Sequence, residues 1–170
     1  MRAILQEYGT PGGLILDAPC GTGRLAPTIS ERGRFVGLDA SGSMLAAARD
    51  KQAGALFQGD LLRLPFQAAS FDTVLCCRLL HHLKTQAELE STLGELMRVT
   101  RGTLAASFWD SLSLAALRRK LPFVRQPAHR APFPKRWIEA AVQSAGGEVL
   151  AWKHSARYFS QQTWFVARKR

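Results

Sequence analysis

The sequence predicts an α/β protein with a doubly wound, mostly parallel sheet of about seven strands and an antiparallel C-terminal hairpin. Short apolar runs alternate with longer mixed segments, a pattern typical of parallel strands joined by helical crossovers. The last two apolar runs are separated by a short connection, which favours an antiparallel pair. At 170 residues the chain is long enough for a sizeable core, and we expect residues 1–170 to form one domain.

Apolar runs and the turn residues between them place each expected element. Ser41 is expected to cap one helix by accepting a backbone N–H bond, and Gly146-Gly147 to end another. In chain order we expect strands at residues 14–17, 35–39, 55–57, 71–77, 103–108, 148–154 and 158–167, and helices at about 23–32, 41–48, 85–99 and 135–144. Residues 110–134 hold four prolines and break this alternation, so we expect them to form a surface insertion.

The charge of the chain is unevenly distributed. Residues 1–110 carry equal numbers of basic and acidic side chains, so the whole formal excess of +10 arises in residues 111–170. Such asymmetry can indicate an anionic partner, and a solvated basic surface is the alternative.

The cysteines and the apolar runs indicate where the protein resides. Cys20, Cys76 and Cys77 are an odd number, and the first residues lack a secretory signal, so we expect free thiols rather than a disulfide framework. Cys76 and Cys77 are adjacent in an expected strand and so point to opposite faces. No apolar run approaches the ~20 residues of a spanning helix. We therefore expect a soluble, cytoplasmic protein with no transmembrane segment.

The stretch LDAPCGTGRL, residues 16–25, follows the first expected strand. Ligands of open parallel sheets bind beyond the carboxyl ends of strands where the chain order reverses. GTGRLA also fits the dinucleotide pattern G-x-G-x-x-G/A, and Asp39 lies near the spacing of a ribose ligand. Asp17, however, would repel a pyrophosphate and would favour a cation. The ligand is therefore expected to carry a positive charge near this loop.

Four motifs in order resemble the class I S-adenosylmethionine-dependent methyltransferases, especially the branch called methyltransferase type 11. They are LDAPCGTG, VGLDAS, QGDLLRLPF and SFDTVLCCRLLHHL, and the resemblance covers roughly residues 10–110. It implies a Rossmann-like fold and S-adenosylmethionine as the cofactor. Two features depart from the family. Pro19 replaces a usual glycine, which fixes φ and removes an N–H group, and only about one turn of helix fits before Gly9.

The resemblance also implies which residues bind the cofactor. Gly21 and Gly23 let the backbone approach the methionine part, and Asp39 accepts hydrogen bonds from both ribose hydroxyls. The full expected set is Asp17, Gly21, Gly23, Asp39, Ser41, Met44, Asp60 and Leu61, the last four lying near the adenine. Simpler roles stay open: Asp17 or Asp39 as helix caps, and Asp60 as a turn residue.

Candidates for acceptor binding and catalysis follow the fourth expected strand and lie in the insertion. His81 or His82 is a candidate general base, because histidine titrates in the useful range. The alternative is that one packs on the core and the other orients the next loop. Arg78, His129 and Arg130 are candidate contacts to a substrate, which their charge suggests is anionic. No metal-ligand spacing is present.

These observations lead to one expected function and two alternatives. We expect methyl transfer from S-adenosylmethionine to a small-molecule or lipid-like acceptor. The alternatives are a nicotinamide-dependent oxidoreductase and a non-catalytic cofactor-binding subunit that completes another protein. Aromatic residues among basic ones also occur in nucleic-acid-binding surfaces, so a nucleic-acid acceptor is open but less favoured.

Overall fold

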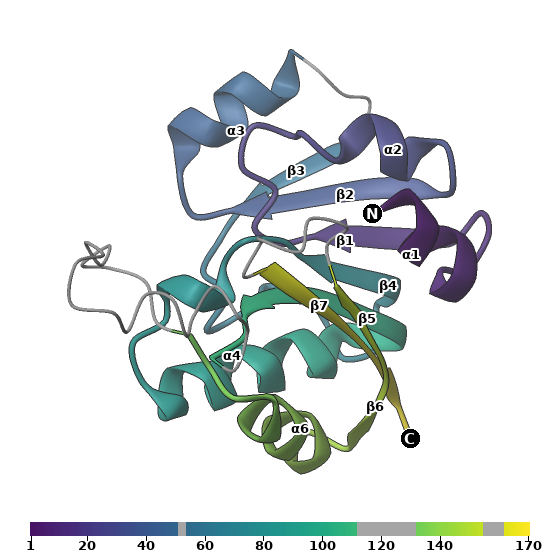
Figure 1. The fold of residues 1–170 in the computed structure, drawn as a ribbon. Helices are drawn as coiled ribbons and strands as arrows, with labels where there is room; N and C mark the ends of the chain where they lie inside the picture. Colours follow the sequence, from purple (N-terminus) through teal and green to yellow (C-terminus); the bar gives the residue numbers. More distant parts are fainter. Residues whose placement is uncertain (51–53, 112–131, 155–161) are drawn as a thin grey trace.

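The computed structural model describes residues 1–50, 54–111, 132–154 and 162–170. Its centre is a seven-stranded sheet of order β3-β2-β1-β4-β5-β7-β6 (Figure 1). Strands β1 to β5 pair in parallel, whereas β7 runs antiparallel to both β5 and β6. The predicted fold class is therefore confirmed. The elements are α1 (Arg2–Tyr8), β1 (Leu14–Asp17), α2 (Ala26–Ser30), β2 (Arg34–Asp39), α3 (Gly42–Arg49), β3 (Ala55–Gln58), β4 (Phe71–Cys76), the 3-10 helix η1 (Leu80–His82), α4 (Gln86–Val99), β5 (Thr100–Trp109), α6 (Lys135–Ser144), β6 (Gly147–His154) and β7 (Gln162–Lys169).

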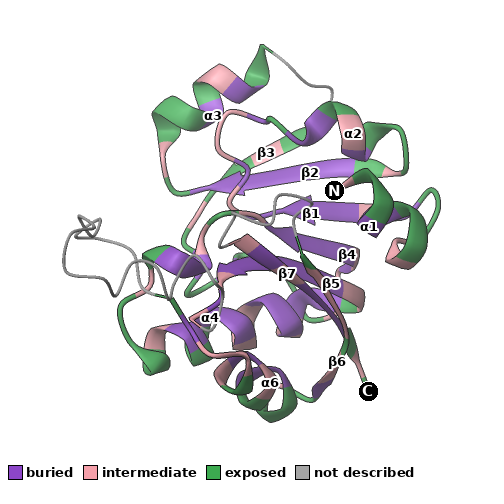
Figure 2. Ribbon diagram, in the orientation of Figure 1, coloured by how far each residue is buried: buried purple, intermediate pink, exposed green. Residues whose placement is uncertain are grey.

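Helices cover both faces of the sheet, because successive side chains of each strand point to opposite sides. Ile15 packs with buried residues of α1, α2 and α3, whereas the next residue, Leu16, packs with those of α4 and α6. Figure 2 shows buried residues concentrated along the central strands and on the inner sides of these helices. Cys76 and Cys77 likewise contact opposite clusters, as predicted, and all three cysteines are free.

Side-chain caps fix the beginnings of two helices. The Ser41 Oγ accepts a 3.4 Å bond from the Met44 amide at the start of α3, as predicted. Thr85 and Glu88 form a reciprocal capping box at the start of α4. Gly146 follows α6 with a φ of +77°, which confirms the predicted end of that helix.

Most elements lie within a residue or two of their predicted bounds, and three differ in a way that has a structural reason. The helix expected at residues 23–32 is reduced to α2, because the preceding residues form hydrogen-bonded turns in which the Gly23 amide donates to the Cys20 carbonyl over 3.0 Å. Strand β5 starts at Thr100 instead of residue 103, since Thr100 already pairs with Phe71 of β4. Helix α1 has seven residues, more than the single turn expected. The first residues of the predicted last strand, 158–161, lie outside the described residues.

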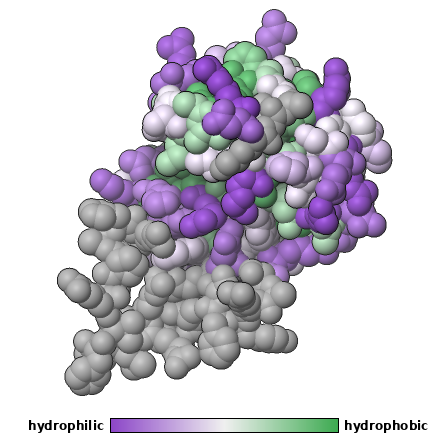
Figure 3. All heavy atoms as spheres, turned by 90° about the horizontal axis from the view of Figure 1, so that it is seen from above, coloured by the Kyte–Doolittle hydropathy of each residue, from purple (hydrophilic) through white to green (hydrophobic). Residues whose placement is uncertain are grey.

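The surface of the described ranges carries few large apolar side chains. Four are exposed, by 40% to 47%: Met44, Phe57, Leu62 and Leu150. In the view from above, Figure 3 shows small hydrophobic patches among hydrophilic side chains. None of the helices in these ranges is long and apolar enough to span a bilayer.

Candidate active site

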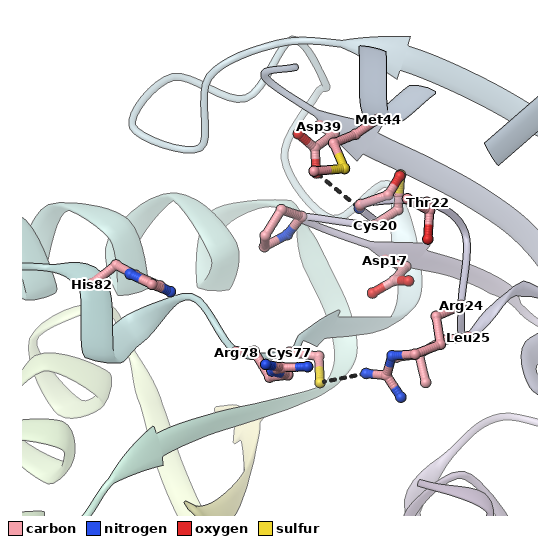
Figure 4. Close-up of a pocket in the computed structure, with 12 residues that line it drawn as sticks. Asp17, Cys20, Thr22, Arg24, Leu25, Asp39, Met44, Cys77, Arg78 and His82 are labelled. Carbon is pink, nitrogen blue, oxygen red and sulfur yellow. Dashed lines mark hydrogen bonds between the residues drawn. The ribbon is translucent and has the colours of Figure 1, made fainter. Parts of the chain in front are cut away.

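A pocket opens where the strand order reverses. The chain builds β1, β2 and β3 toward one edge and then returns to place β4 and β5 on the other side of β1. Loops after β1, β2 and β4 enclose a volume of about 420 Å³ beyond the ends of these strands. The pocket is therefore at the place predicted for ligands of an open parallel sheet. The lining residues are Asp17, Pro19, Cys20, Gly21, Thr22, Arg24, Leu25, Asp39, Met44, Cys77, Arg78 and His82 (Figure 4).

The two glycines of the loop after β1 have different surroundings. Both have positive φ, +55° at Gly21 and +69° at Gly23. A Cβ atom added to Gly21 would meet no atom of the described residues within 4 Å, whereas one added to Gly23 would lie 3.3 Å from the Ala48 Cβ of α3. Gly21 therefore leaves open space beside the pocket, and Gly23 lets the loop pack against α3.

Asp39 ties the loop after β1 to the start of α3. It is 8% exposed, its Oδ2 accepts a 2.8 Å bond from the Gly21 amide, and its Oδ1 accepts a 2.9 Å bond from the Ser41 amide. Each carboxylate oxygen can accept more than one hydrogen bond, so both keep capacity for a ligand hydroxyl. The residue that caps α3 is Ser41, so the alternative role of Asp39 as the helix cap is wrong.

Asp17 lies at the end of β1 and is 1% exposed. Within the described residues, its buried Oδ1 has no hydrogen-bond partner. Burial raises the pKa of this carboxyl to about 7, a shift that the positive charge of Arg24 opposes and the negative charge of Asp39 increases. Helix α2 begins after Leu25 without any side-chain cap, so the alternative role of Asp17 as a cap is also wrong. A buried carboxylate without a donor is costly, and a positively charged ligand group would satisfy it.

The wall after β4 contains one candidate acceptor contact and one candidate base. Arg78 has a φ of +63°, a strained value for a non-glycine residue, and its amide donates a 2.8 Å bond to the Ser107 Oγ. His82 is exposed and lines the pocket. His81 is 4% exposed, its ring stacks on Trp109 at 4.8 Å, and it is not one of the residues that line the pocket. The structure therefore brings only His82 to the pocket, and His81 packs on the core.

Other predicted site residues do not line this pocket. Ser41 caps α3, and Leu61 is buried in the core. Asp60 is exposed, and its Oδ1 accepts a 2.9 Å bond from the Leu62 amide, which is the turn geometry kept open as an alternative. Gly23 packs on α3 as described above. His129 and Arg130 lie outside the described residues, as does most of the expected insertion.

The structure also reveals lining residues that the sequence did not single out. Arg24 directs a nitrogen to the Cys77 sulfur, with the Nη2 and Sγ atoms 3.4 Å apart. Burial raises the pKa of the Cys77 thiol, and it raises that of Cys20 to about 12, so both thiols are neutral at physiological pH. Arg24 directly follows Gly23, the second motif glycine, and this position is the feature of the sequence that could have indicated a lining residue. In the described ranges no group of three His, Cys, Asp or Glu side chains is arranged to hold a metal ion.

A family comparison identifies the kind of protein. The model of the methyltransferase domain family matches residues 15–102. The chain belongs to the methyltransferase family. The predicted resemblance to class I S-adenosylmethionine-dependent methyltransferases is thus confirmed.

Individual relatives agree with this assignment. The methyltransferase is 40% identical over 151 residues to malonyl-[acyl-carrier protein] O-methyltransferase of Erwinia pyrifoliae, covering 85% of this chain and 55% of that one. It is 34% identical over 111 residues to demethylmenaquinone methyltransferase of Desulfitobacterium hafniense, covering 59% and 43%. The chain thus spans about half the length of these curated relatives.

A solved structure shares the fold. Magnesium protoporphyrin IX methyltransferase from Synechocystis PCC 6803, solved with bound SAH, superimposes with a TM-score of 0.85 at 22% identity, over 99% of this chain and 80% of that one.

Proposed function

We propose that this methyltransferase transfers a methyl group from S-adenosylmethionine to a small-molecule or lipid-like acceptor. The observation that carries the proposal is the pair of buried carboxylates, Asp17 and Asp39, at the ends of neighbouring strands of one pocket. One oxygen of Asp17 has no partner in the part of the chain that the structure describes, and it is suited to an ammonium group. Asp39 retains acceptor capacity suited to two adjacent hydroxyls. S-adenosylmethionine carries both kinds of group.

The rest of the pocket fits the same cofactor. The open space beside Gly21 accommodates the chain between the ammonium group and the ribose. Met44 is 44% exposed and lines the pocket from α3, where it would pack on the adenine. The cofactor contacts predicted for Gly23, Ser41, Asp60 and Leu61 remain part of the proposal, as weaker contacts made by residues that do not line the pocket.

When bound, S-adenosylmethionine supplies a methyl group already activated by a positively charged sulfur. The protein residues then mainly bind and orient the reactants and exclude water. Arg78 contacts the acceptor from the loop after β4. His82 accepts a proton from acceptors that are protonated at rest. His81 supports this loop through its stacking on Trp109 rather than reacting itself.

The proposed acceptor class is supported by two of the relatives and by charge. These two are named for demethylmenaquinone and for a malonyl-[acyl-carrier protein], whereas a further relative is named as a probable tRNA methyltransferase, so a nucleic-acid acceptor stays the alternative. The basic residues of the C-terminal third favour an anionic acceptor, with His129 and Arg130 of the insertion among its contacts.

We also propose that residues 1–170 form one domain, with 110–134 as the acceptor-site insertion. The three free cysteines favour a cytoplasmic location for the protein.

Calorimetric titration tests the proposal. We expect heat of binding with S-adenosylmethionine and S-adenosylhomocysteine, and none with NAD, because Asp17 disfavours a pyrophosphate. Binding of NAD alone would favour the oxidoreductase alternative. A methyl-transfer screen of metabolite extracts should then yield a labelled product. Tight cofactor binding with no product in any extract would favour the non-catalytic subunit.

A further inference from the structure

The loop between β3 and β4, residues 59–70, begins beside the proposed ribose carboxylate. The Gly59 amide donates a 3.2 Å bond to the carbonyl of Asp39, and the Gln58 side chain donates a 3.1 Å bond to the carbonyl of Ala40. These bonds tie the start of the loop to the end of β2, where the Asp39 side chain lines the pocket. A shift of this loop would therefore displace the wall at the adenosine end of the proposed cofactor site.

Helix α4 holds the middle of the same loop. The Glu95 Oε2 accepts a 2.7 Å bond from the Leu64 amide. Arg98 donates to two carbonyls, from Nη1 to Phe66 over 2.8 Å and from Nη2 to Leu64 over 3.1 Å. The Arg98 carbonyl also accepts a 2.9 Å bond from the Ala69 amide. Because these bonds go to backbone groups of the loop, they fix the path of the chain rather than a single side chain.

Glu95 and Arg98 also orient each other. The Arg98 Nε lies 2.6 Å from the Glu95 Oε1 and the Nη2 lies 2.9 Å from the Oε2, which makes a two-pronged pair. The hydrogen bonds from Arg98 hold the pKa of the Glu95 carboxyl below its usual range, and those to Glu95 raise the pKa of the guanidinium. Both groups are therefore charged at neutral pH. The Glu95 side chain is only 20% exposed, so water competes less than it does for a surface pair.

The same helix supports the other wall of the pocket with its first turn. The capping box of Thr85 and Glu88 begins α4 shortly after His82, and the Glu88 Oε2 also accepts a 2.6 Å bond from the Lys84 amide. One helix thus holds the loop after β4 at its beginning and the loop after β3 near its end. The two walls of the pocket are therefore fixed relative to one another through α4.

We propose that Glu95 and Arg98 are positioning residues for the adenosine end of the cofactor, and that they act through the loop after β3. This inference rests on the proposed function, in which Asp39 binds the ribose and Asp60 and Leu61 lie near the adenine. A wall that is already held in its binding position loses less conformational entropy when the ligand arrives. Neither Glu95 nor Arg98 lines the pocket, so their effect on affinity passes through the loop.

Calorimetry with S-adenosylmethionine and 5′-methylthioadenosine tests the assignment without relying on catalysis. Both ligands carry the adenosine group, and only the first carries the amino acid. Arg98→Ala should weaken both by the same factor, roughly three- to tenfold, because the loosened wall lies at the group that they share. Arg98→Lys keeps the charge beside Glu95 but loses the planar fork that reaches two carbonyls, so it should weaken both ligands less.

Arg101→Ala is the matched control. It also removes an arginine that pairs with a carboxylate, that of Asp72, but it does so at the N-terminal end of β5, away from the pocket. Neither affinity should change in this variant. Hydrogen exchange of the Leu64 amide reports directly whether the loop is released, and it should accelerate in Arg98→Ala but not in Arg101→Ala.

The outcomes separate this inference from the proposed function. If the unaltered protein binds neither ligand, the proposed function fails and the inference fails with it. If it binds both, and Arg98→Ala accelerates exchange at Leu64 but keeps both affinities, only the inference is overturned. A loss confined to S-adenosylmethionine would also overturn it, because the effect would then lie at the amino-acid end.

Two conservative variants carry the test if Arg98→Ala does not fold. Arg98→Lys is the first. Glu95→Gln is the second: it keeps an oxygen for the Leu64 amide and loses the charge that orients Arg98, so it should weaken both ligands by a similar, smaller factor. Affinities of both variants equal to those of the unaltered protein would rule out the positioning role.

Discussion

Asp39 and Asp17 end neighbouring strands of one sheet, yet the structure satisfies only one of them. Asp39 accepts backbone bonds from Gly21 and Ser41 on its two oxygens, whereas one oxygen of Asp17 has no donor among the residues that the structure describes. Asp39 therefore holds the pocket loops together, whereas Asp17 is available to a ligand. Substitution of Asp39 should lower both the free energy of unfolding and the affinity for the cofactor, whereas substitution of Asp17 should affect the two in opposite directions.

The largest effect is expected from Asp39→Ala. It leaves the part-buried Gly21 and Ser41 amides without their acceptor, at about 1–3 kcal/mol for each donor, and removes the proposed ribose contact. We expect the free energy of unfolding to fall by about 2–5 kcal/mol and affinity for S-adenosylmethionine to fall roughly tenfold or more. Denaturant unfolding and calorimetry measure both. Asp39→Asn, which keeps one acceptor oxygen, should lose less, and unchanged affinity in Asp39→Ala would contradict the ribose assignment.

In contrast to Asp39→Ala, Asp17→Asn should stabilise the free protein at neutral pH while it weakens cofactor binding. The pKa of Asp17 is about 7 in the folded protein and about 3.9 when unfolded, so the folded state binds the proton more tightly. Because the pKa is raised in the folded state, the favourable contribution of Asp17 to the free energy of unfolding is fully present below about pH 4 and is lost as pH rises through about 7.

Unfolding of both proteins from pH 4.5 to 8 measures this effect. The stability of the unaltered protein should decline relative to Asp17→Asn by up to roughly 3–4 kcal/mol across this window. A constant difference would contradict the buried, proton-binding carboxyl. Asp17 has charge interactions with five other titratable groups: Arg24, Asp39, Cys20, Cys76 and Cys77.

Alanine substitution of the loop glycines Gly21 and Gly23 should also separate stability from binding, with smaller effects. Alanine at either position requires an unfavourable positive φ, costing about 1–2 kcal/mol. Gly23→Ala also presses on Ala48, so it should destabilise more than Gly21→Ala. Gly21→Ala instead adds a methyl group beside the open pocket and should weaken S-adenosylmethionine more. Melting temperatures and affinities of the two variants measure these effects. A lower melting temperature for Gly21→Ala, or a lower affinity for Gly23→Ala, would contradict these roles.

Ser41→Ala should have the smallest effect. The loss of the α3 cap costs about 1 kcal/mol, and affinity should change less than about twofold because Ser41 does not line the pocket. Ser41→Thr, which keeps a capping oxygen, is the matched control. A larger affinity loss in Ser41→Ala alone would instead support the cofactor contact predicted from the sequence.

The sequence predicted the sheet and one half of the pocket because these depend on local patterns. Asp17, Gly21 and Asp39 are close to strand ends, and the strand ends follow from apolar runs. Arg24 and Cys77 could not be paired in this way, because their contact depends on β4 lying beside β1, with Asp17 opposite Leu75.

The histidine pair shows a second limit of the sequence. A single turn of 3-10 helix decides that His81 stacks on Trp109 and His82 reaches the pocket, and neither residue type nor spacing encodes that choice.

The position of Cys77 has a practical consequence. Cys20 and Cys76 are buried, whereas Cys77 is half-buried and lines the pocket. A thiol-directed reagent should therefore modify the native protein first at Cys77, and slowly, because burial raises its pKa. Any ligand that fills the pocket should shield this sulfur, so the unaltered chain carries its own chemical reporter of occupancy. Libraries of cofactors and acceptors can be screened by labelling rate before a single reaction product is known.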